Sequence, residues 1–166
     1  GHFPIGNDEP RGSLLNQSPG FAAVGGGDDL VACLGKRVGE HFQGNIVVVA
    51  AKVSGLAPGM HGFHIHEKGD CSSGDGMSAG GHFNPLGKPH AYPTIMDRHA
   101  GDMPMLAADA AGNAAMTAEL DVITIGSGAA DVVGKAVIVH KDPDDFKTQP
   151  TGNAGARVAC GVIRKS

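Results

Sequence analysis

Short apolar runs separated by turn-forming residues recur along the middle and end of the chain. Five such runs are rich in Val, Ile, Leu and Ala, and a sixth alternates Phe and Ile with His; both patterns are typical of β-strands. Between them lie turn signals such as Pro58-Gly59 and Gly112-Asn113. We therefore expect strands at 30–34, 46–53, 62–66, 114–120, 133–139 and 158–163.

Two long segments lack this periodicity. Residues 1–28 are rich in Gly, Pro, Asn and Asp, and we expect an irregular N-terminal arm there, followed by one domain over residues 29–166. Residues 67–113 are rich in His, Asp and Gly. Loops of that length in a compact domain are usually functional or disordered, and this composition favours function.

Composition narrows the class of protein. Gly accounts for 27 of 166 residues, which argues against a helix bundle because Gly is costly inside helices. A hydrophobic content of 41% is too high for a disordered chain. No apolar run reaches the roughly 18 residues of a membrane span, so no membrane partner is expected. A net charge of −4 argues against nucleic-acid binding. Residues 1–10 lack the features of a secretory signal, and we expect that any such signal has been removed.

Histidines carry the strongest chemical signal. His64 and His66 are two apart in a predicted strand, which places them on one face. A lone pair of this kind is more often two surface histidines than a metal site. His82, His90, His99 and Asp102 together form a full tetrahedral set for zinc, although a polar loop contains such residues without a metal too. His140 ends an apolar strand, and imidazole-rich sites suit copper as well as zinc.

Several motifs in order resemble the copper/zinc superoxide dismutase family. The match covers about residues 55–163 and includes GFHIHE at 62–67, AGGHFNP at 79–85, RHAGD at 98–102 and GNAGARVACGVI at 152–163. The resemblance implies an all-β fold, an antiparallel Greek-key β-sandwich or flattened barrel with long functional loops. Since the N-terminal third fits the family poorly, we expect that part of the sheet to be irregular.

The resemblance also implies residue roles. Copper would be bound by His64, His66, His82 and His140, and zinc by His82, His90, His99 and Asp102. His82 would then bridge the metals and carry a proton during catalysis. Asp144 would link His64 to His90, and Arg157 would guide the anionic substrate. Three cysteines allow one disulfide and one free thiol, and the family's disulfide corresponds to Cys71 and Cys160. His61 is similar to a buried structural histidine of the family.

The implied activity is an oxidoreductase reaction that converts two superoxide anions and two protons to O2 and hydrogen peroxide. Two other classes remain open: a metal-binding domain such as that of a copper chaperone, and a sandwich used for subunit contact only. The complete copper set and Arg157 favour the enzyme. The length of the segment from Cys71 to His82 and the short one before Arg157 look bacterial. We expect the periplasm, with the cytoplasm as the alternative, and the family makes a homodimer one expected state.

Overall fold

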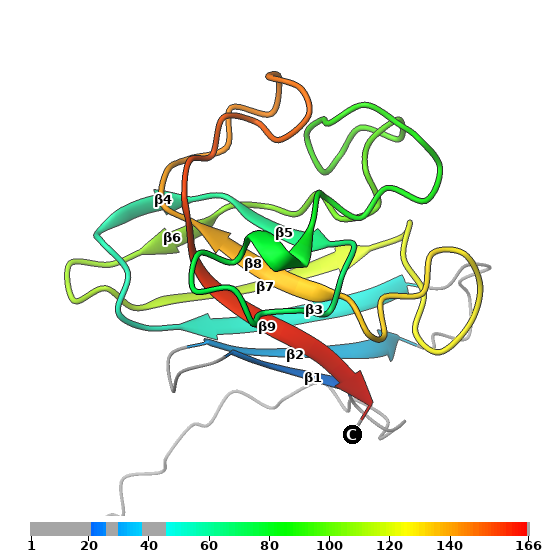
Figure 1. Cartoon of the computed structure of the whole chain (residues 1–166), viewed down its shortest axis with the longest axis horizontal. Helices are drawn as coiled ribbons and strands as arrows, with labels where there is room; N and C mark the ends of the chain where they lie inside the picture. The colour runs from blue at the N-terminus through cyan, green and yellow to red at the C-terminus, as the bar shows by residue number, and fades with distance from the viewer. Residues whose placement is uncertain (1–20, 26–29, 38–45, 166) are drawn as a thin grey trace, which may run out of the picture.

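The computed structural model describes residues 21–25, 30–37 and 46–165. This part of the chain forms nine β-strands and one short 3-10 helix (Figure 1). The elements are β1 (Phe21–Gly25), β2 (Leu30–Arg37), β3 (Ile46–Val53), β4 (Gly59–His61), β5 (Phe63–His66), η1 (Met77–Ala79), β6 (Leu106–Ala108), β7 (Ala114–Leu120), β8 (Ala136–His140) and β9 (Arg157–Lys165). In the described residues no helix has the length and apolarity that crossing a membrane requires.

The strands follow the order β4-β6-β7-β3-β2-β1-β9-β8-β5, and all neighbouring strands pair antiparallel. The two edge strands, β4 and β5, are consecutive in the chain with only Gly62 between them. The sheet must therefore curl until its edges approach, which gives two facing layers (Figure 1). The expected antiparallel β-sandwich is confirmed.

Alternation along the strands creates the core between the layers. In β3, Val47, Val49, Ala51 and Val53 are buried, as a period of two requires. Phe63 and Ile65 of β5 join the same cluster. Because successive side chains in a strand point to opposite faces, His64 and His66 lie on the other side of β5 from this core.

The strand predictions were correct for 46–53 and 114–120 and shifted at the ends of the others. The irregular arm is wrong for Phe21–Gly25, because these residues form β1, which pairs with both β2 and β9. The other residues of 1–28 lie outside the described part of the chain. The short strands β4 and β6 and the helix η1 were not predicted; two of them lie inside the segment 67–113.

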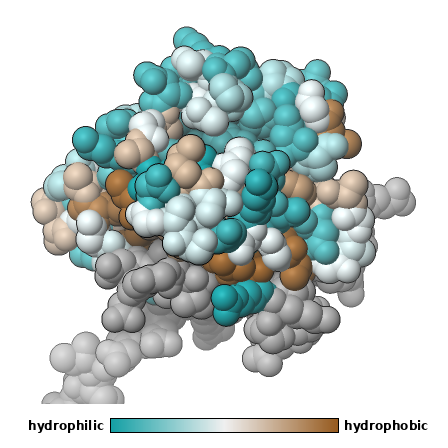
Figure 2. Space-filling model, viewed as in Figure 1, coloured by the Kyte–Doolittle hydropathy of each residue, from teal (hydrophilic) through white to brown (hydrophobic). Residues whose placement is uncertain are grey.

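Two long connections stand beside each other on the same side of the sandwich. One follows η1 and contains residues 80–105, and the other joins β8 to β9 through residues 141–156 (Figure 1, green and orange). The surface over both is mostly hydrophilic (Figure 2). These connections, together with the outward face of β5 and β8, enclose the predicted site residues.

Candidate metal centre

Four histidines from three parts of the fold converge in one cluster. His64 and His66 come from β5, His140 ends β8 beside a bulge in its pairing with β9, and His82 forms an isolated bridge to His66. All four are buried, and one ring nitrogen from each lies within 4.8 Å of the others. We call this set the tetrahistidine cluster.

The ring nitrogens of this cluster are divided into two kinds. One nitrogen of each ring lies next to an acceptor: His64 Nε2 at 2.6 Å from Asp144 Oδ2, His66 Nδ1 at 2.9 Å from the Gly80 carbonyl, His82 Nδ1 at 3.0 Å from Asp102 Oδ1 and His140 Nδ1 at 3.2 Å from the Gly155 carbonyl. The other nitrogens are buried and have no hydrogen-bond partner; they are His64 Nδ1, His66 Nε2, His82 Nε2 and His140 Nε2.

Unpaired buried polar atoms are expensive, at about 1–3 kcal/mol each. Four of them pointing into one place therefore require a physical explanation. Donation of the opposite N–H to an acceptor leaves each unpaired nitrogen with a free lone pair, which is the form of imidazole that binds a metal ion. The tetrahistidine cluster fits a metal with four nitrogen ligands.

A second set, the carboxylate cluster, contains His82, His90, His99 and Asp102. The three Nδ1 atoms lie 3.0, 2.8 and 3.4 Å from Asp102 Oδ1, and all four residues are buried. The other oxygen of Asp102 accepts hydrogen bonds from the backbone N–H groups of Ala91 and His99. Three imidazole nitrogens and one carboxylate oxygen are a donor set typical of four-coordinate zinc. His82 belongs to both clusters through its two different nitrogens.

Asp144 connects the two clusters. Its Oδ2 accepts from His64 Nε2, and its Oδ1 lies 2.9 Å from His90 Nε2. The backbone N–H of Phe146 also donates to Oδ1, at 2.7 Å. Gly152 passes so close that a Cβ there would collide with Asp144 and His90, and its φ of 68° also favours glycine. The single carboxylate therefore fixes the orientation of one ring in each cluster.

The two clusters differ in which of their side chains are ionised. Burial lowers the pKa of His64 to about 3, of His66 to about 2 and of His140 to about 4, so these rings are neutral near pH 7. Burial also lowers the pKa of His90, but hydrogen bonds to Asp102 and Asp144 outweigh it and raise that pKa to about 9. Burial opposes ionisation of Asp102, yet hydrogen bonds from His82, His90 and His99 hold its pKa far below the usual range. Asp102 is therefore a carboxylate paired with a protonated His90, and a metal would replace the proton on His90.

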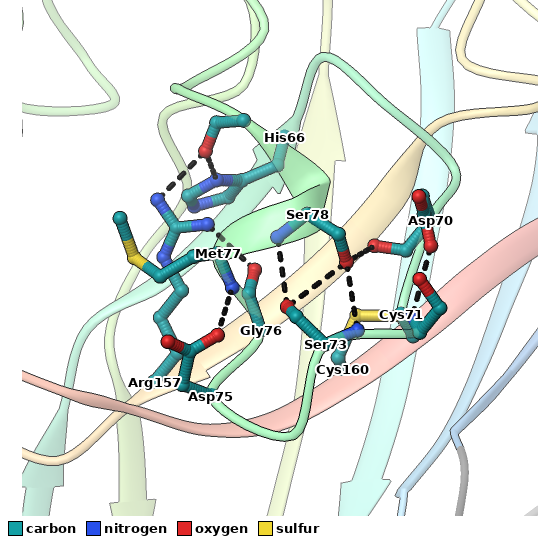
Figure 3. Close-up of a disulfide and its surroundings, with 12 residues drawn as sticks. His66, Asp70, Cys71, Ser73, Asp75, Gly76, Met77, Ser78, Arg157 and Cys160 are labelled. Carbon is teal, nitrogen blue, oxygen red and sulfur yellow. Dashed lines mark hydrogen bonds between the residues drawn. A yellow bond between two sulfur atoms is a disulfide. The ribbon is translucent and has the colours of Figure 1, made fainter.

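Arg157 lies at the edge of the tetrahistidine cluster. It begins β9 opposite His140, and its two terminal nitrogens donate to the carbonyls of Gly76 and Gly80, each at 2.7 Å (Figure 3). The Gly80 carbonyl also accepts from His66. The half-buried guanidinium is therefore fixed beside one of the histidines, where it offers a positive charge to an anion.

The predicted disulfide is present. Cys71 and Cys160 are bonded, with 5.7 Å between their Cα atoms and 89 residues between them in sequence (Figure 3). The bond joins the loop after β5 to β9, so it ties the Gly76 carbonyl to the strand that carries Arg157. Within this loop, Ser73 and Ser78 are linked through their side chains, and Ser78 also donates to the Asp70 carbonyl.

Every residue predicted as a ligand, as the link or as the anion guide lies in or beside these clusters. His61 does not: it is buried, and its ring nitrogens lie 2.7 and 2.8 Å from the carbonyls of His140 and Ala57. The sequence did not point to the Gly76 and Gly80 carbonyls, because every residue carries a carbonyl. It also gave no motif for Gln149, whose side chain contacts the main chain of His90.

Comparisons with known proteins agree with this geometry. A family model described as copper/zinc superoxide dismutase matches residues 37–163. The chain is 40% identical over 162 residues to superoxide dismutase [Cu-Zn] 3 of Arabidopsis thaliana. This match covers 94% of this chain and 93% of the relative. It is also similar to a solved structure of the clock protein EA4, with a TM-score of 0.76 and 36% identity over 89% of this chain and 95% of that one.

Proposed function

The chain belongs to the copper/zinc superoxide dismutase family, and from this premise we propose a role for each residue of its metal centre. The protein is an oxidoreductase that converts two superoxide anions and two protons into O2 and hydrogen peroxide. Its cofactors are copper and zinc. Copper, when bound, supplies the one-electron redox change of both half-reactions, whereas zinc has no redox change and is structural and electrostatic.

The tetrahistidine cluster is the proposed copper site. His64 Nδ1 and the Nε2 atoms of His66, His82 and His140 would hold the ion, and the unpaired state of these four buried nitrogens is the observation that carries the assignment. The acceptors on the opposite nitrogens fix the tautomers, so the chain has already oriented the lone pairs before a metal arrives.

The carboxylate cluster is the proposed zinc site, with His82, His90, His99 and Asp102 as ligands. Because His82 offers Nδ1 to this set and Nε2 to the other, it is the proposed bridge. Its Nε2 is also the atom proposed to take up a proton and return it to the product. Asp144 orients His64 and His90 and binds neither ion in this assignment.

Arg157 is the proposed site of substrate attraction. The guanidinium is held by two carbonyls and offers its charge beside His66, where a small anion approaching the copper site would meet it. On a chain with a net charge of −4, attraction of an anion has to be local. Lys147 and Lys141, which are exposed on the neighbouring connection, are proposed to add to the positive field.

Metal content and superoxide consumption measured on the same sample test this assignment. We expect one copper and one zinc per chain in active protein, and we expect His140→Ala to lose copper and turnover while it retains zinc. A matched change of the buried histidine outside both clusters, His61→Gln, should keep both metals in the folded fraction. Unchanged activity in His140→Ala, or loss of zinc with copper retained, would contradict the ligand assignment.

Two further proposals concern the compartment and the oligomeric state. The Cys71–Cys160 disulfide supports an oxidising compartment, and we propose the periplasm, with the cytoplasm as the alternative because this family keeps a disulfide there too. Cell fractionation of the source organism decides between them. We also propose a homodimer, in line with many family members, and sedimentation equilibrium that gives the mass of a single chain would contradict it.

A further inference from the structure

The connection between β8 and β9 contacts His90 from several sides. The side chain of Asp144 lies at 2.9 Å from Nε2 of His90, and the ring of Phe146 is stacked against its imidazole, with 6.2 Å between centroids and 13° between planes. Tyr92 packs edge-on against the ring of Phe146, with 4.5 Å between the two ring centroids. The imidazole is thus positioned at one nitrogen and at one face by a loop more than fifty residues away in the chain.

Gln149 of the same connection holds the main chain of His90. Its Oε1 accepts from the His90 N–H at 2.8 Å, and its Nε2 donates to the His90 carbonyl at 2.7 Å. This pair of bonds mimics the pairing of a β-bridge, with a side-chain amide in place of a backbone amide. The Gln149 side chain thus satisfies both the N–H and the carbonyl of His90. The position and the orientation of the His90 peptide units are therefore fixed together.

The neighbours of His90 are held locally. Asn84 makes the same kind of reciprocal pair with Lys88, at 2.8 and 2.9 Å, and the N–H of Ala91 donates to Asp102. The main-chain N–H and carbonyl of His90 are instead held from the opposite loop. That loop is ordered by its own bonds: Asp145 accepts from the N–H groups of Lys147 and Thr148 and from the Thr148 hydroxyl.

We propose that Gln149 is a positioning residue for zinc: its amide fixes the main chain of His90 and so holds Nδ1 of that ring in the geometry that zinc requires. This inference rests on the proposed role of His90 as a zinc ligand. It also couples the two loops, because the connection that holds His90 is the one that carries Asp144 and ends at Arg157.

Two variants separate the bonds. Gln149→Glu keeps the acceptor for the His90 N–H but replaces the donor with an oxygen that faces the His90 carbonyl, and Gln149→Met removes both bonds at similar size. Gln149 is exposed, so neither change should prevent folding. With water able to compete for these groups, we expect zinc to leave about tenfold faster in Gln149→Glu and severalfold faster in Gln149→Met.

The experiment follows the transfer of zinc from the metal-loaded protein to a chromogenic chelator. The control is Asn113→Asp, the same amide-to-acid change at an exposed turn between β6 and β7, and its release rate should stay within about twofold of the wild type. Release from both Gln149 variants at the rate of this control would overturn the inference.

A second readout separates positioning from general loosening of the loop. When Co²⁺ replaces zinc, its visible absorption reports the ligand geometry, and we expect that spectrum to change in Gln149→Glu. Faster release with an unchanged Co²⁺ spectrum would overturn the positioning role. His90→Ala tests the underlying assignment: if it binds a full equivalent of zinc at the wild-type release rate, the proposed zinc site fails, whereas loss of zinc in His90→Ala with unchanged Gln149 variants overturns only this inference.

Discussion

At the scale of single residues, hydrogen bonding decides which nitrogen of each ring is available to a metal. In the tetrahistidine cluster the acceptors are the carboxylates of Asp144 and Asp102 and two backbone carbonyls. Each of them contacts one ring nitrogen, and the other nitrogen of that ring has no hydrogen-bond partner. The residue type alone does not make that choice, because neutral imidazole carries its proton on either nitrogen. Tautomers are thus selected by atoms that are not themselves proposed copper ligands.

Asp144→Asn tests this directly. The amide oxygen can replace Oδ1, which accepts from Phe146 and faces His90, but the NH2 then meets the N–H of His64. His64 must move its proton to Nδ1, the nitrogen assigned to copper. We expect copper affinity to fall about 10- to 100-fold and zinc affinity to fall less. Competition with chelators measures both.

The control for that change is Asp142→Asn, at an exposed carboxylate on the same connection. Its copper affinity should match that of the wild type. Retention of copper by Asp144→Asn, or a greater loss of zinc than of copper, would show that the carboxylate does not act through the tautomer of His64.

Protonation gives the metal-free protein a stability maximum. The pKa values of His64, His66 and His140 are lowered from 6.5 to about 3, 2 and 4, so the unfolded chain binds protons first as the pH falls below 6.5. Stability is then lost progressively toward pH 4. The pKa of His90 is raised to about 9, so its contribution is complete below pH 6.5 and is lost as the pH rises through 9. Urea unfolding of chelator-treated protein should therefore be most difficult near pH 6.5; stability that rises steadily from pH 5 to 9 would contradict this.

At the scale of elements, β5 presents Phe63 and Ile65 to the core and its histidines to the loops, and β8 presents Val137 and Val139 to the same core. The periodicity of apolar residues predicted both strands, and for 46–53 and 114–120 it gave the observed bounds. It missed β4 and β6 because three residues are too few to show a period, and β1 because Phe21–Gly25 is flanked by Gly-rich sequence. What makes these segments strands is the partner beside them, such as β9 for β1.

Gly62 is a position between two strands where substitution should disturb the copper ligands. It separates β4 from β5, its N–H donates to the Asp142 carbonyl and its carbonyl accepts from His140. A Cβ there would lie 2.8 Å from the Ala154 Cβ and 3.2 Å from His64 Cε1. We expect Gly62→Ala to cost about 1–3 kcal/mol of stability and to weaken copper binding, because His64 has to move.

Unfolding in denaturant and copper titration check that expectation. Gly35→Ala is a suitable control, since a Cβ at Gly35 meets no atom within 4 Å. If Gly62→Ala binds copper as tightly as Gly35→Ala, the close approach at Gly62 does not constrain the copper ligands.

At the scale of the whole molecule, one covalent bond and two loops hold the centre together. The disulfide closes a loop of about ninety residues. It also attaches to β9 the segment whose carbonyls accept hydrogen bonds from Arg157. In the chain-entropy model, a bond across such a separation contributes about 4.6 kcal/mol. The metal centre is thus stabilised by a link outside it.

Cys160→Ser should therefore lower the free energy of unfolding of the metal-free protein by about 4.6 kcal/mol. In the metal-loaded protein we expect a lower rate with superoxide and a weaker dependence of that rate on salt, because the guanidinium of Arg157 loses its fixed position. Denaturant unfolding and rate measurements at several ionic strengths check both effects. A rate and salt dependence equal to those of the wild type would separate the disulfide from Arg157.

The sequence by itself indicated the chemistry: which side chains are the proposed ligands, that His64 and His66 share a face, and which segments become long strands. These properties are local, since they depend on residue type and on the period of a strand. Tertiary structure alone decided which nitrogen of each tetrahistidine ring is left unpaired, that Asp144 reaches two rings, and that the Gly80 carbonyl and the Gln149 amide hold His66, Arg157 and His90. Those contacts join residues up to about eighty positions apart through groups that many residues share, so they exist only once the curled sheet has brought the loops together.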